Sequence, residues 1–296
     1  MNKILITGVS GFLGWNLARH LKEKYLVYGT CLDNPVSIPG VEVLTTDLSD
    51  WNKIEQFCRT VNPVVIIHTA AYANADFCEL HHKEALTLNT FATRELAKAA
   101  NRMDCRLIYI STDFVFDGKR GAYSEADNPA PMSYYGKTKF LAELEITTHC
   151  SRYVTLRIGT LYGRGSGIRP NFFETMEKQL LAARRPSCVV DQYRTFLFVE
   201  DAVQAISQVV GQMSLKGLFH LGGPEKASRF EFAEKLCGQL RVPVSLIEKV
   251  RLADFTSAAP RPPDCSLNSD KIKRVLDLNL SSISQALDHL CAGRSS

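Results

Sequence analysis

The stretch SYYGKTKF, residues 133–140, places two tyrosines beside two lysines. On a helix, Tyr135 and Lys139 stand four residues apart and share a face, while Tyr134 and Lys137 are neighbours at i and i+3. A phenol has a pKa of about 10 and is a poor acid or base near neutrality. A nearby ammonium group favours the phenolate, so we expect it to lower that pKa and suit the tyrosine to proton transfer. The spacing alone does not separate such a pair from a solvated helix surface.

A second stretch of chemical interest is TGVSGFLG, residues 7–14, which follows a strand-like run and opens a helix-like one. Gly8, Gly11 and Gly14 lack a Cβ, which lets the backbone approach a pyrophosphate closely. The helix N-terminus then supplies N–H donors and a positive dipole. The spacing is GxxGxxG instead of GxGxxG. Its position between a strand and a helix favours a dinucleotide site over a purely structural turn.

Two acidic residues are placed to contact the adenosine half of such a dinucleotide. Asp33 lies about 20 residues beyond the turn, where an acid would bind the ribose diol and favour NAD. Residues 29–34 contain no Arg or Lys to accept a 2′-phosphate, which gives a slight preference for NAD over NADP. Asp47, followed by Leu48, is placed to meet the adenine. Asp33 is equally compatible with a loop role, and Asp47 with capping the next helix.

The elements that must position these residues alternate along the first half of the chain. Short β-rich apolar runs predict strands at 3–8, 26–31, 41–47, 64–68, 106–111 and 153–158. Helical patterns lie between them at 12–22, 51–60, 82–100 and 133–148. This alternation predicts an α/β fold, a Rossmann-type doubly wound parallel sheet with helices on both faces.

The second half of the chain is less regular and predicts a smaller C-terminal substrate lobe. Helical stretches recur at 172–183, 200–212, 230–240 and 282–290, and a strand at 217–222 is placed to return to the sheet. Loops rich in glycine or proline lie at 163–171 and 258–266. We therefore predict a dinucleotide-binding domain of residues 1–165, rejoined by 197–222. Residues 166–196 and 223–296 are predicted to form the substrate-binding lobe.

Composition excludes several other classes of protein. The 296 residues carry a net charge of +4 with the two signs interleaved and no long basic run, which does not suggest nucleic-acid binding. The longest apolar runs are too short to span a bilayer, and no signal-peptide pattern opens the chain, so we expect a cytoplasmic protein. The nine cysteines are scattered without a CxxC pair, which argues against a zinc site or disulfide framework.

The stretch STDFVFDG, residues 111–118, completes a pattern with SYYGKTK and TGVSGFLG. Together these motifs resemble the extended short-chain dehydrogenase/reductase family, and within it the branch of dTDP-4-dehydrorhamnose reductases. Similar segments extend along almost the whole chain, at 66–79, 156–163, 171–176, 189–202, 217–225 and 261–267. The resemblance implies a Rossmann-type fold, an NAD or NADP cofactor and a small nucleotide-sugar substrate. It also allows a homodimer.

The resemblance assigns roles to the catalytic candidates. The family pattern YGxxK matches Tyr135, Gly136 and Lys139, so Tyr135 becomes the expected proton donor and Lys139 a ligand of the nicotinamide ribose. Thr112 stands where the family has a Ser or Thr that holds the substrate carbonyl; alternatively, it only bonds its own loop. Asn89 is expected to order a water or the helix backbone near Lys139, or else to be an ordinary polar residue of a helix surface.

The resemblance also implies the residues that contact ligands. Cofactor contacts are expected from Gly8, Ser10, Gly11, Phe12, Leu13, Gly14, Asp33, Asp47, Leu48, Ala70, Ala71 and Tyr72, together with Tyr135 and Lys139. Substrate contacts are expected from Asp113, Phe114, Val115, Asn171, Arg194 and Arg261. Guanidinium groups fit phosphate oxygens bidentately, so the two arginines are candidates for the substrate diphosphate; inter-lobe salt bridges are the alternative.

Phe114 bears on which reaction is expected. Dehydratases of the family have a glutamate at this position, and a phenyl ring cannot exchange a proton, so the resemblance favours reduction of a 4-keto sugar. Thr160 stands where the reductases commonly carry a tryptophan, and Phe196-Leu197 replaces their Pro-Thr pair, which leaves the sugar open. Asn16 stands where metal-bridged reductases have a glutamate, so we expect no metal.

Two other functions remain open from the sequence. The same branch contains the regulatory beta subunit of methionine adenosyltransferase, which keeps these motifs, so a non-catalytic NAD(P)-binding subunit is the first alternative. A nucleotide-sugar epimerase or dehydrogenase is the second, and it would require tightly retained NAD.

Overall fold

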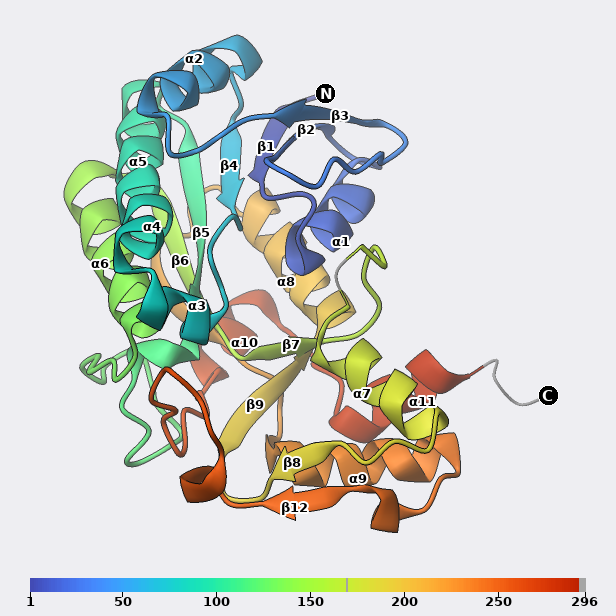
Figure 1. Ribbon diagram of the computed structural model, residues 1–296. Coiled ribbons are helices and arrows are strands. Elements are labelled where there is room, and N and C mark those ends of the chain that lie inside the picture. Colours follow the sequence, from blue (N-terminus) through green and yellow to red (C-terminus); the bar gives the residue numbers. More distant parts are fainter. Residues whose placement is uncertain (169, 293–296) are drawn as a thin grey trace.

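The computed structural model describes residues 1–168 and 170–292, and its centre is one parallel sheet (Figure 1). Seven strands pair in the order β10-β6-β5-β4-β1-β2-β3, and every pairing is parallel. The strands are β1 (Lys3–Thr7), β2 (Leu26–Cys31), β3 (Val41–Thr45), β4 (Val65–His68), β5 (Arg106–Thr112), β6 (Tyr153–Ile158) and β10 (Gly217–Leu221). The predicted Rossmann-type α/β fold is confirmed, and β10 joins the sheet beside β6.

Helices cover both faces of the sheet, as Figure 1 shows. One face carries α2 (Trp51–Val61), α5 (Ala92–Arg102) and α6 (Tyr134–His149). The other carries α1 (Phe12–Leu21) and α8 (Val199–Gly211), with α10 (Asp270–Leu276) packed beside β10. The face of α1 predicted to be apolar, Leu13, Leu17 and Leu21, is buried. Each such leucine contributes about 1.5–3 kcal/mol of hydrophobic stabilisation.

The helix predicted at 82–100 is interrupted by a π turn. The segment runs as α4 (His82–Leu86), the π turn η1 (Thr87–Phe91) and then α5. The wider turn buries Asn89, and single π turns of this kind often occur at functional sites. The preceding α3 (Ala75–Leu80) was not predicted, although Asn74 caps it by accepting hydrogen bonds from the amides of Asp76 and Phe77.

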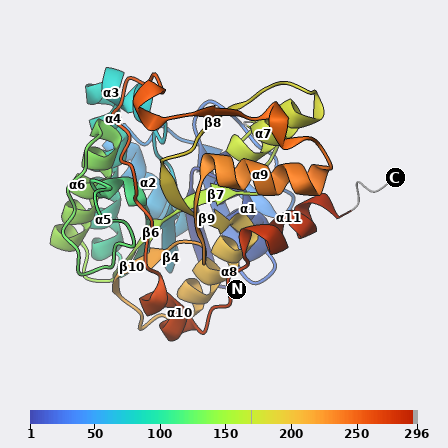
Figure 2. The same ribbon diagram turned by 90° about the horizontal axis from the view of Figure 1, so that it is seen from below.

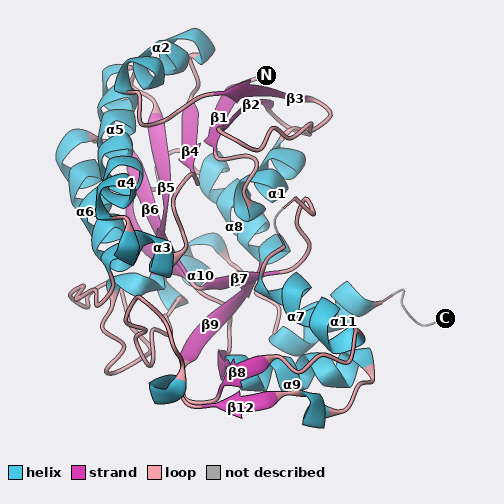
Figure 3. Ribbon diagram, in the orientation of Figure 1, coloured by secondary structure: helices cyan, strands magenta, loops and turns pink. Residues whose placement is uncertain are grey.

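The second lobe contains two small sheets (Figure 3). A three-stranded sheet has the order β11-β9-β7 and a two-stranded sheet has the order β12-β8. Their strands are β7 (Thr160–Tyr162), β8 (Ser187–Val189), β9 (Tyr193–Phe198), β11 (Lys226–Ser228) and β12 (Glu248–Val250). The lobe's helices are α7 (Phe172–Leu181), α9 (Arg229–Leu240) and α11 (Ile283–Cys291). Seen from below, α7, α9 and α11 gather on one side of the molecule (Figure 2).

The lobe lies at the end of the main sheet toward which the parallel strands point (Figure 1). Ligands of open α/β sheets bind at this carboxyl edge. Eight of the cysteines are buried in the described part of the chain, which fits their predicted role as small core residues. No helix among the described residues is long and apolar enough to cross a membrane.

Candidate active site

The end of β5 and the start of α6 meet at the catalytic candidates. Ser133 caps α6 by accepting a hydrogen bond from the amide of Gly136 at 3.2 Å. A Cβ on Gly136 would lie 2.2 Å from the carbonyl oxygen of Phe114, in the short turn η2 (Asp113–Val115) that follows β5. Only glycine permits this close approach. The contact brings Tyr135, in the first turn of α6, beside Thr112 at the end of β5.

Tyr135 and Thr112 form the centre of the site. The Thr112 hydroxyl lies near enough to Tyr135 to act on the pKa of its phenol, and the Tyr135 ring meets Phe114 edge-on at 5.7 Å. Thr112 also bonds its own loop, by donating to Asp113 Oδ1 and accepting from the amide of Phe114, both at 3.2 Å. Burial raises the pKa of Tyr135 above its ordinary value, against the lowering effect of Thr112. The prediction of a lowered tyrosine pKa is therefore wrong for the free protein, because desolvation outweighs it. The phenol is a protonated donor at neutral pH.

Lys139 is buried one helical turn below Tyr135. Its Nζ donates a hydrogen bond to the carbonyl oxygen of Ile110 at 2.7 Å and lies 4.2 Å from the centre of the Tyr109 ring. Burial lowers the pKa of Lys139 to about 7, because the charged ammonium is disfavoured away from water. A lysine with this pKa can both carry a positive charge and exchange a proton near neutrality.

Asn89 ties the loop after β4 to the catalytic helix. Its Oδ1 accepts from the amide of Tyr72 at 2.9 Å, and its Nδ2 donates to the carbonyl of Tyr72 at 3.1 Å and to Thr138 Oγ1 at 3.0 Å. The side chain is 1% exposed, so it is not an ordinary surface residue. Thr138 immediately precedes Lys139, so Asn89 orders the region around the lysine through a threonine side chain.

We expect Asn89→Leu to lower the free energy of unfolding by roughly 1–3 kcal/mol, because the part-buried amide of Tyr72 loses its acceptor and Thr138 Oγ1 loses a donor. The measurement is urea denaturation. Asn52→Leu, at an exposed position of α2, is the matched control and should change stability little. Equal stability of the two variants would show that the Asn89 bonds are replaceable by water.

The glycine turn has the close contacts that a dinucleotide cradle requires. Gly8 has φ +77°, in the region that favours glycine, and a Cβ there would lie 2.8 Å from Ala70 Cα. A Cβ on Gly14 would lie 2.3 Å from the carbonyl oxygen of Gly8. Gly11 stands at the N-cap of α1, where no side chain accepts a hydrogen bond from the helix amides. These amides fit an anionic ligand such as a pyrophosphate.

Other predicted cofactor residues surround this turn with different exposures. Ser10 and Phe12 are partly exposed, whereas the side chain of Leu13 is buried in the core. Ala70, Ala71 and Tyr72 follow β4 and are partly exposed. They form the neighbouring loop, which the Gly8 contact brings against the turn.

The adenosine-side candidates are less closely defined. Asp33 is exposed just beyond β2. Asp47 accepts a hydrogen bond from the amide of Ser49 at 2.8 Å, but the residue that caps α2 is Asp50, so the capping alternative for Asp47 is wrong. Leu48 is buried with the core beneath α2.

Arg194 and Arg261 form ion pairs between the lobe and the main sheet region. Arg194 Nε lies 3.4 Å from Asp113 Oδ2, and both side chains are buried. The Arg194 guanidinium also stacks 4.9 Å from the centre of the Phe114 ring. Arg261 donates to Asp76 in α3 at 2.6 Å. The predicted alternative of salt bridges therefore describes both arginines in the free protein, while the buried Arg194 Nη2 has no hydrogen-bond partner among the described residues.

The sequence reasoning missed Arg229, at the start of α9. Desolvation and the positive charges of Arg194 and Arg261 lower the pKa of Arg229, which shows that three arginines share one region. Its guanidinium lies 5.7 Å from the centre of the Phe172 ring. The sequence did contain a signal for its position: Ser228 and Glu231 form a capping box, which places Arg229 at the start of a helix.

Two predicted substrate residues have structural roles in the described chain. Val115 is fully buried in a small apolar cluster with Phe116 and Leu267. Asn171 caps α7, where its Oδ1 accepts from two amides and its Nδ2 donates to the carbonyl of Gly163 and to Glu174. The side chain of Asn171 is therefore already occupied by these bonds.

The departures from the family pattern also have structural explanations. Phe196, in place of a proline, is buried in the lobe, with its ring stacked on Phe232 at 4.8 Å. Thr160 lies opposite it in the register of β7 and β9. Asn16 donates to the carbonyls of Phe12 and Arg164. Among the described residues no three acidic, histidine or cysteine side chains gather as a metal site, and the absence of a metal stays a prediction.

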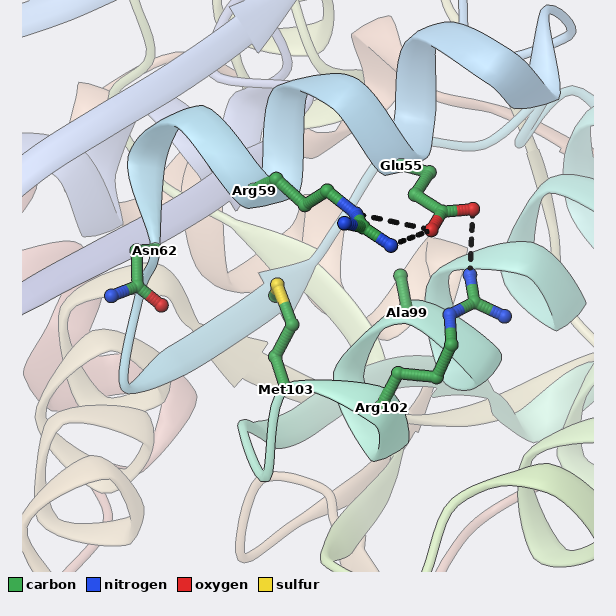
Figure 4. Close-up of a pocket in the computed structure, with 6 residues that line it drawn as sticks. All are labelled: Glu55, Arg59, Asn62, Ala99, Arg102 and Met103. Carbon is green, nitrogen blue, oxygen red and sulfur yellow. Dashed lines mark hydrogen bonds and ion pairs between the residues drawn. The ribbon is translucent and has the colours of Figure 1, made fainter.

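A surface cavity of about 320 Å³ lies at the opposite end of the sheet, between α2 and α5. Figure 4 shows Glu55 bonded to two arginines there, at 2.7 Å to Arg59 and 3.0 Å to Arg102. Both bonds are exposed, so they contribute little to stability. No catalytic candidate lines this cavity.

Known proteins resemble this chain along its whole length. A family model described as RmlD substrate binding domain matches residues 1–294. The dTDP-4-dehydrorhamnose reductase of Aggregatibacter actinomycetemcomitans is 28% identical, with 99% of each chain covered. Methionine adenosyltransferase 2 subunit beta of Danio rerio is also 28% identical, over 92% of this chain and 84% of that protein. A crystal structure of dTDP-4-dehydrorhamnose reductase from Bacillus anthracis with NADP superposes with a TM-score of 0.87, at 28% identity and 98% coverage of both chains.

Proposed function

Because the chain belongs to the RmlD substrate binding domain family, we propose that it is an NAD(P)H-dependent reductase. Its substrate is a nucleotide-linked 4-keto-6-deoxysugar such as dTDP-4-dehydrorhamnose. The observation that supports this most is the meeting of Thr112, protonated Tyr135 and Lys139 at the carboxyl end of β5. Simple reduction requires only carbonyl polarisation, one proton and a hydride, and these residues supply the first two.

The residues present fit a dinucleotide, because the Gly8 and Gly14 positions leave no space for a Cβ and the α1 amides lack a side-chain cap. Gly8, Gly11 and Gly14 would hold the pyrophosphate, and Lys139 the nicotinamide ribose. A bound reduced nicotinamide supplies the hydride. The Thr112 hydroxyl would exchange its bond to Asp113 for one to the keto oxygen, and Tyr135 gives that oxygen its phenolic proton. Lys139 stands one helical turn from Tyr135 on the same face of α6, where an ammonium group would favour the phenolate that Tyr135 leaves behind.

Phe114 restricts the site to reduction. Its ring packs edge-on against Tyr135, where a carboxylate would be needed to remove a proton for dehydration. The ring carries no titratable group. Elimination of water from the sugar therefore lacks its acid–base pair at this position.

The substrate diphosphate is assigned to the arginine region of the lobe. Arg194 has a buried Nη2 without a hydrogen-bond partner among the described residues, and Arg229 lies close enough to feel its charge. Arg261 would have to exchange its bond with Asp76 for one to phosphate. In this proposal residues 1–165 with 197–222 bind the dinucleotide, and residues 166–196 with 223–296 bind the sugar nucleotide.

We expect Asp33→Asn to shift cofactor preference toward NADPH, because it removes a negative charge from the ribose 2′ side. The ratio of kcat/KM for NADPH over NADH should rise about tenfold, which corresponds to about 1.4 kcal/mol. Steady-state kinetics with both cofactors measure this ratio. Asp254→Asn, in a 3-10 turn of the lobe, is the control. An unchanged ratio would leave Asp33 as a loop residue only.

The function is tested by incubating the purified protein with NADH or NADPH and dTDP-4-dehydrorhamnose. Loss of the reduced nicotinamide absorbance, with dTDP-rhamnose as the product, is the expected result. Tyr134→Phe should keep this activity, because Tyr134 stacks on His82 outside the catalytic pair. Dinucleotide binding with no turnover on any 4-keto sugar would contradict the proposal.

A second function is favoured by one comparison. The similarity to methionine adenosyltransferase 2 subunit beta covers 92% of this chain at the same identity as the reductase. A protein that binds a dinucleotide but serves as a partner subunit would keep the fold and the glycine turn without needing turnover. Copurification with a methionine adenosyltransferase, in the absence of reductase activity, would support this function. The arrangement of the catalytic residues gives no reason for a loss of reductase activity, so we prefer the reductase function.

A further inference from the structure

Glu143 is a buried carboxylate directly behind the catalytic residues. It is 6% exposed and lies in α6 one turn beyond Lys139. Arg157, in β6, binds it through two nitrogens, Nη2 to Oε2 at 2.7 Å and Nε to Oε1 at 3.0 Å. Ser111, next to Thr112 in β5, donates its hydroxyl to Glu143 Oε1. A charge this deeply buried requires such partners.

Three residues on one face of α6 lie against three consecutive residues of β5. Tyr135, Lys139 and Glu143 stand at i, i+4 and i+8, so they line one side of the helix. Tyr135 lies beside Thr112, Lys139 donates to the Ile110 carbonyl and Glu143 accepts from the Ser111 hydroxyl. These contacts, which we call the polar row, fix α6 against β5. Glu143 makes the contact farthest along the helix from Tyr135.

The row continues across the sheet from Glu143. Ser111, Arg157 and His220 are register partners on β5, β6 and β10, so their side chains share one face. Arg157 Nη1 lies 3.4 Å from His220 Nε2, and His220 Nδ1 lies 2.9 Å from the carbonyl of Tyr123. Because an arginine only donates and a carbonyl only accepts, His220 is neutral with its proton on Nδ1. Burial lowers the pKa of His220 to about 4, which agrees with this assignment.

From this arrangement we propose that Glu143 is a positioning residue of the reductase, whose carboxylate keeps a proton on Lys139 and holds the Thr112 strand against α6. The proposal rests on the reductase function given above. Glu143 touches neither substrate nor cofactor and acts through Lys139 and Ser111. The positive charge of Arg157 stabilises the buried Glu143 carboxylate, so Glu143 stays ionised near Lys139.

The environment of Lys139 explains why one carboxylate matters there. Burial lowers the pKa of Lys139, and the charge of Glu143 raises it. The polar or titratable groups around Lys139 are Tyr135 and Glu143 on its own helix, Cys78 on α3, His68 on β4 and Tyr109 on β5. Glu143 is the only full negative charge in this set, because burial keeps the Cys78 thiol and the Tyr109 phenol protonated.

The test is Glu143→Gln, which removes the charge and keeps the shape. kcat/KM for NADPH should fall as pH rises through the pKa of Lys139, because the ammonium is then lost. Removing the negative charge of Glu143 lowers the pKa of Lys139. The alkaline limb of the pH profile of kcat/KM should therefore move to lower pH by about one unit. Glu145→Gln is the control, because Glu145 lies in the same helix and pairs with His149 away from the site. An unshifted limb in Glu143→Gln would overturn the proposal.

A double variant separates this effect from simple loss of a buried ion pair. Glu143→Gln leaves Arg157 unpaired and should lower stability, whereas Glu143→Gln with Arg157→Met removes both charges and should recover much of it. Arg157 is not among the charges that act on Lys139, so the double variant should still show the shifted limb. A wild-type pH profile in the stable double variant would show that Glu143 serves only to neutralise Arg157.

A separate readout distinguishes failure of the reductase function from failure of this proposal. The Kd for NADPH, measured by calorimetry between acidic and alkaline pH, reports Lys139 without any substrate. If the wild-type protein binds NADPH but turns over no 4-keto sugar, the reductase function fails. In that case a downward shift of the binding profile in Glu143→Gln still supports the role of Glu143, and identical profiles reject it.

Discussion

Tyr135→Phe is expected to lower kcat by about two to four orders of magnitude while leaving NADPH affinity unchanged. The substitution removes one oxygen, which carries the proton that we assign to the keto oxygen. Burial keeps the Tyr135 phenol protonated at neutral pH, so the wild-type protein begins each turnover with that proton in place. Thr112 can still polarise the carbonyl, which accounts for the residual rate.

Pre-steady-state NADPH oxidation with the keto sugar measures this effect on the chemical step. Tyr134→Phe is the matched control, because it makes the same chemical change one residue earlier, on a ring that stacks on His82 at 3.7 Å. The Tyr135→Phe variant should also unfold at a denaturant concentration close to wild type, since the phenyl ring keeps its edge contact with Phe114. Equal loss of activity in the two variants would contradict the assignment of Tyr135.

The centre of the main sheet could be predicted from the sequence because strands such as β4 and β5 are buried on both faces. Runs such as residues 64–68 are apolar without alternation, which is typical of strands in a parallel sheet. The small strands of the lobe, such as β7 and β8, were not predicted, since three residues are too few to show a period. The π turn at Thr87–Phe91 was also missed, because it interrupts the hydrogen bonding without interrupting the helical pattern of apolar residues.

The candidate site was only partly predictable for a different reason. Helical spacing places Tyr135 and Lys139 on one face without singling them out. Their catalytic roles, and the position of Thr112 beside Tyr135, were predicted from the resemblance of the motifs to the family. The direction of the tyrosine pKa does not follow from spacing, because it depends on how much water the folded chain removes from the phenol. The ion-pair partner of Arg194 could not be predicted either. Asp113 is distant in sequence, and the two side chains come together only because β9 packs beside the end of β5.

Gly14→Ala tests the dinucleotide cradle most directly. An alanine Cβ at this position would lie 2.3 Å from the carbonyl oxygen of Gly8 and 2.8 Å from Thr69 Oγ1. The first of these atoms is backbone, so the turn itself must move to relieve the contact. We expect NADPH binding to weaken about 10- to 100-fold, because overpacking of this size costs about 1–3 kcal/mol and distorts the amides that meet the pyrophosphate.

Gly238→Ala is the control that isolates crowding from the general effect of replacing a glycine. Gly238 lies exposed within α9, and a Cβ there meets nothing within 4 Å. Since alanine is the better helix former, this variant should gain about 0.5–1 kcal/mol of stability and bind NADPH as wild type does. Calorimetric titration of both variants measures the contrast. Normal NADPH affinity in Gly14→Ala would mean that the pyrophosphate does not lie against this turn. That result would contradict the cofactor assignment of Gly8, Gly11 and Gly14.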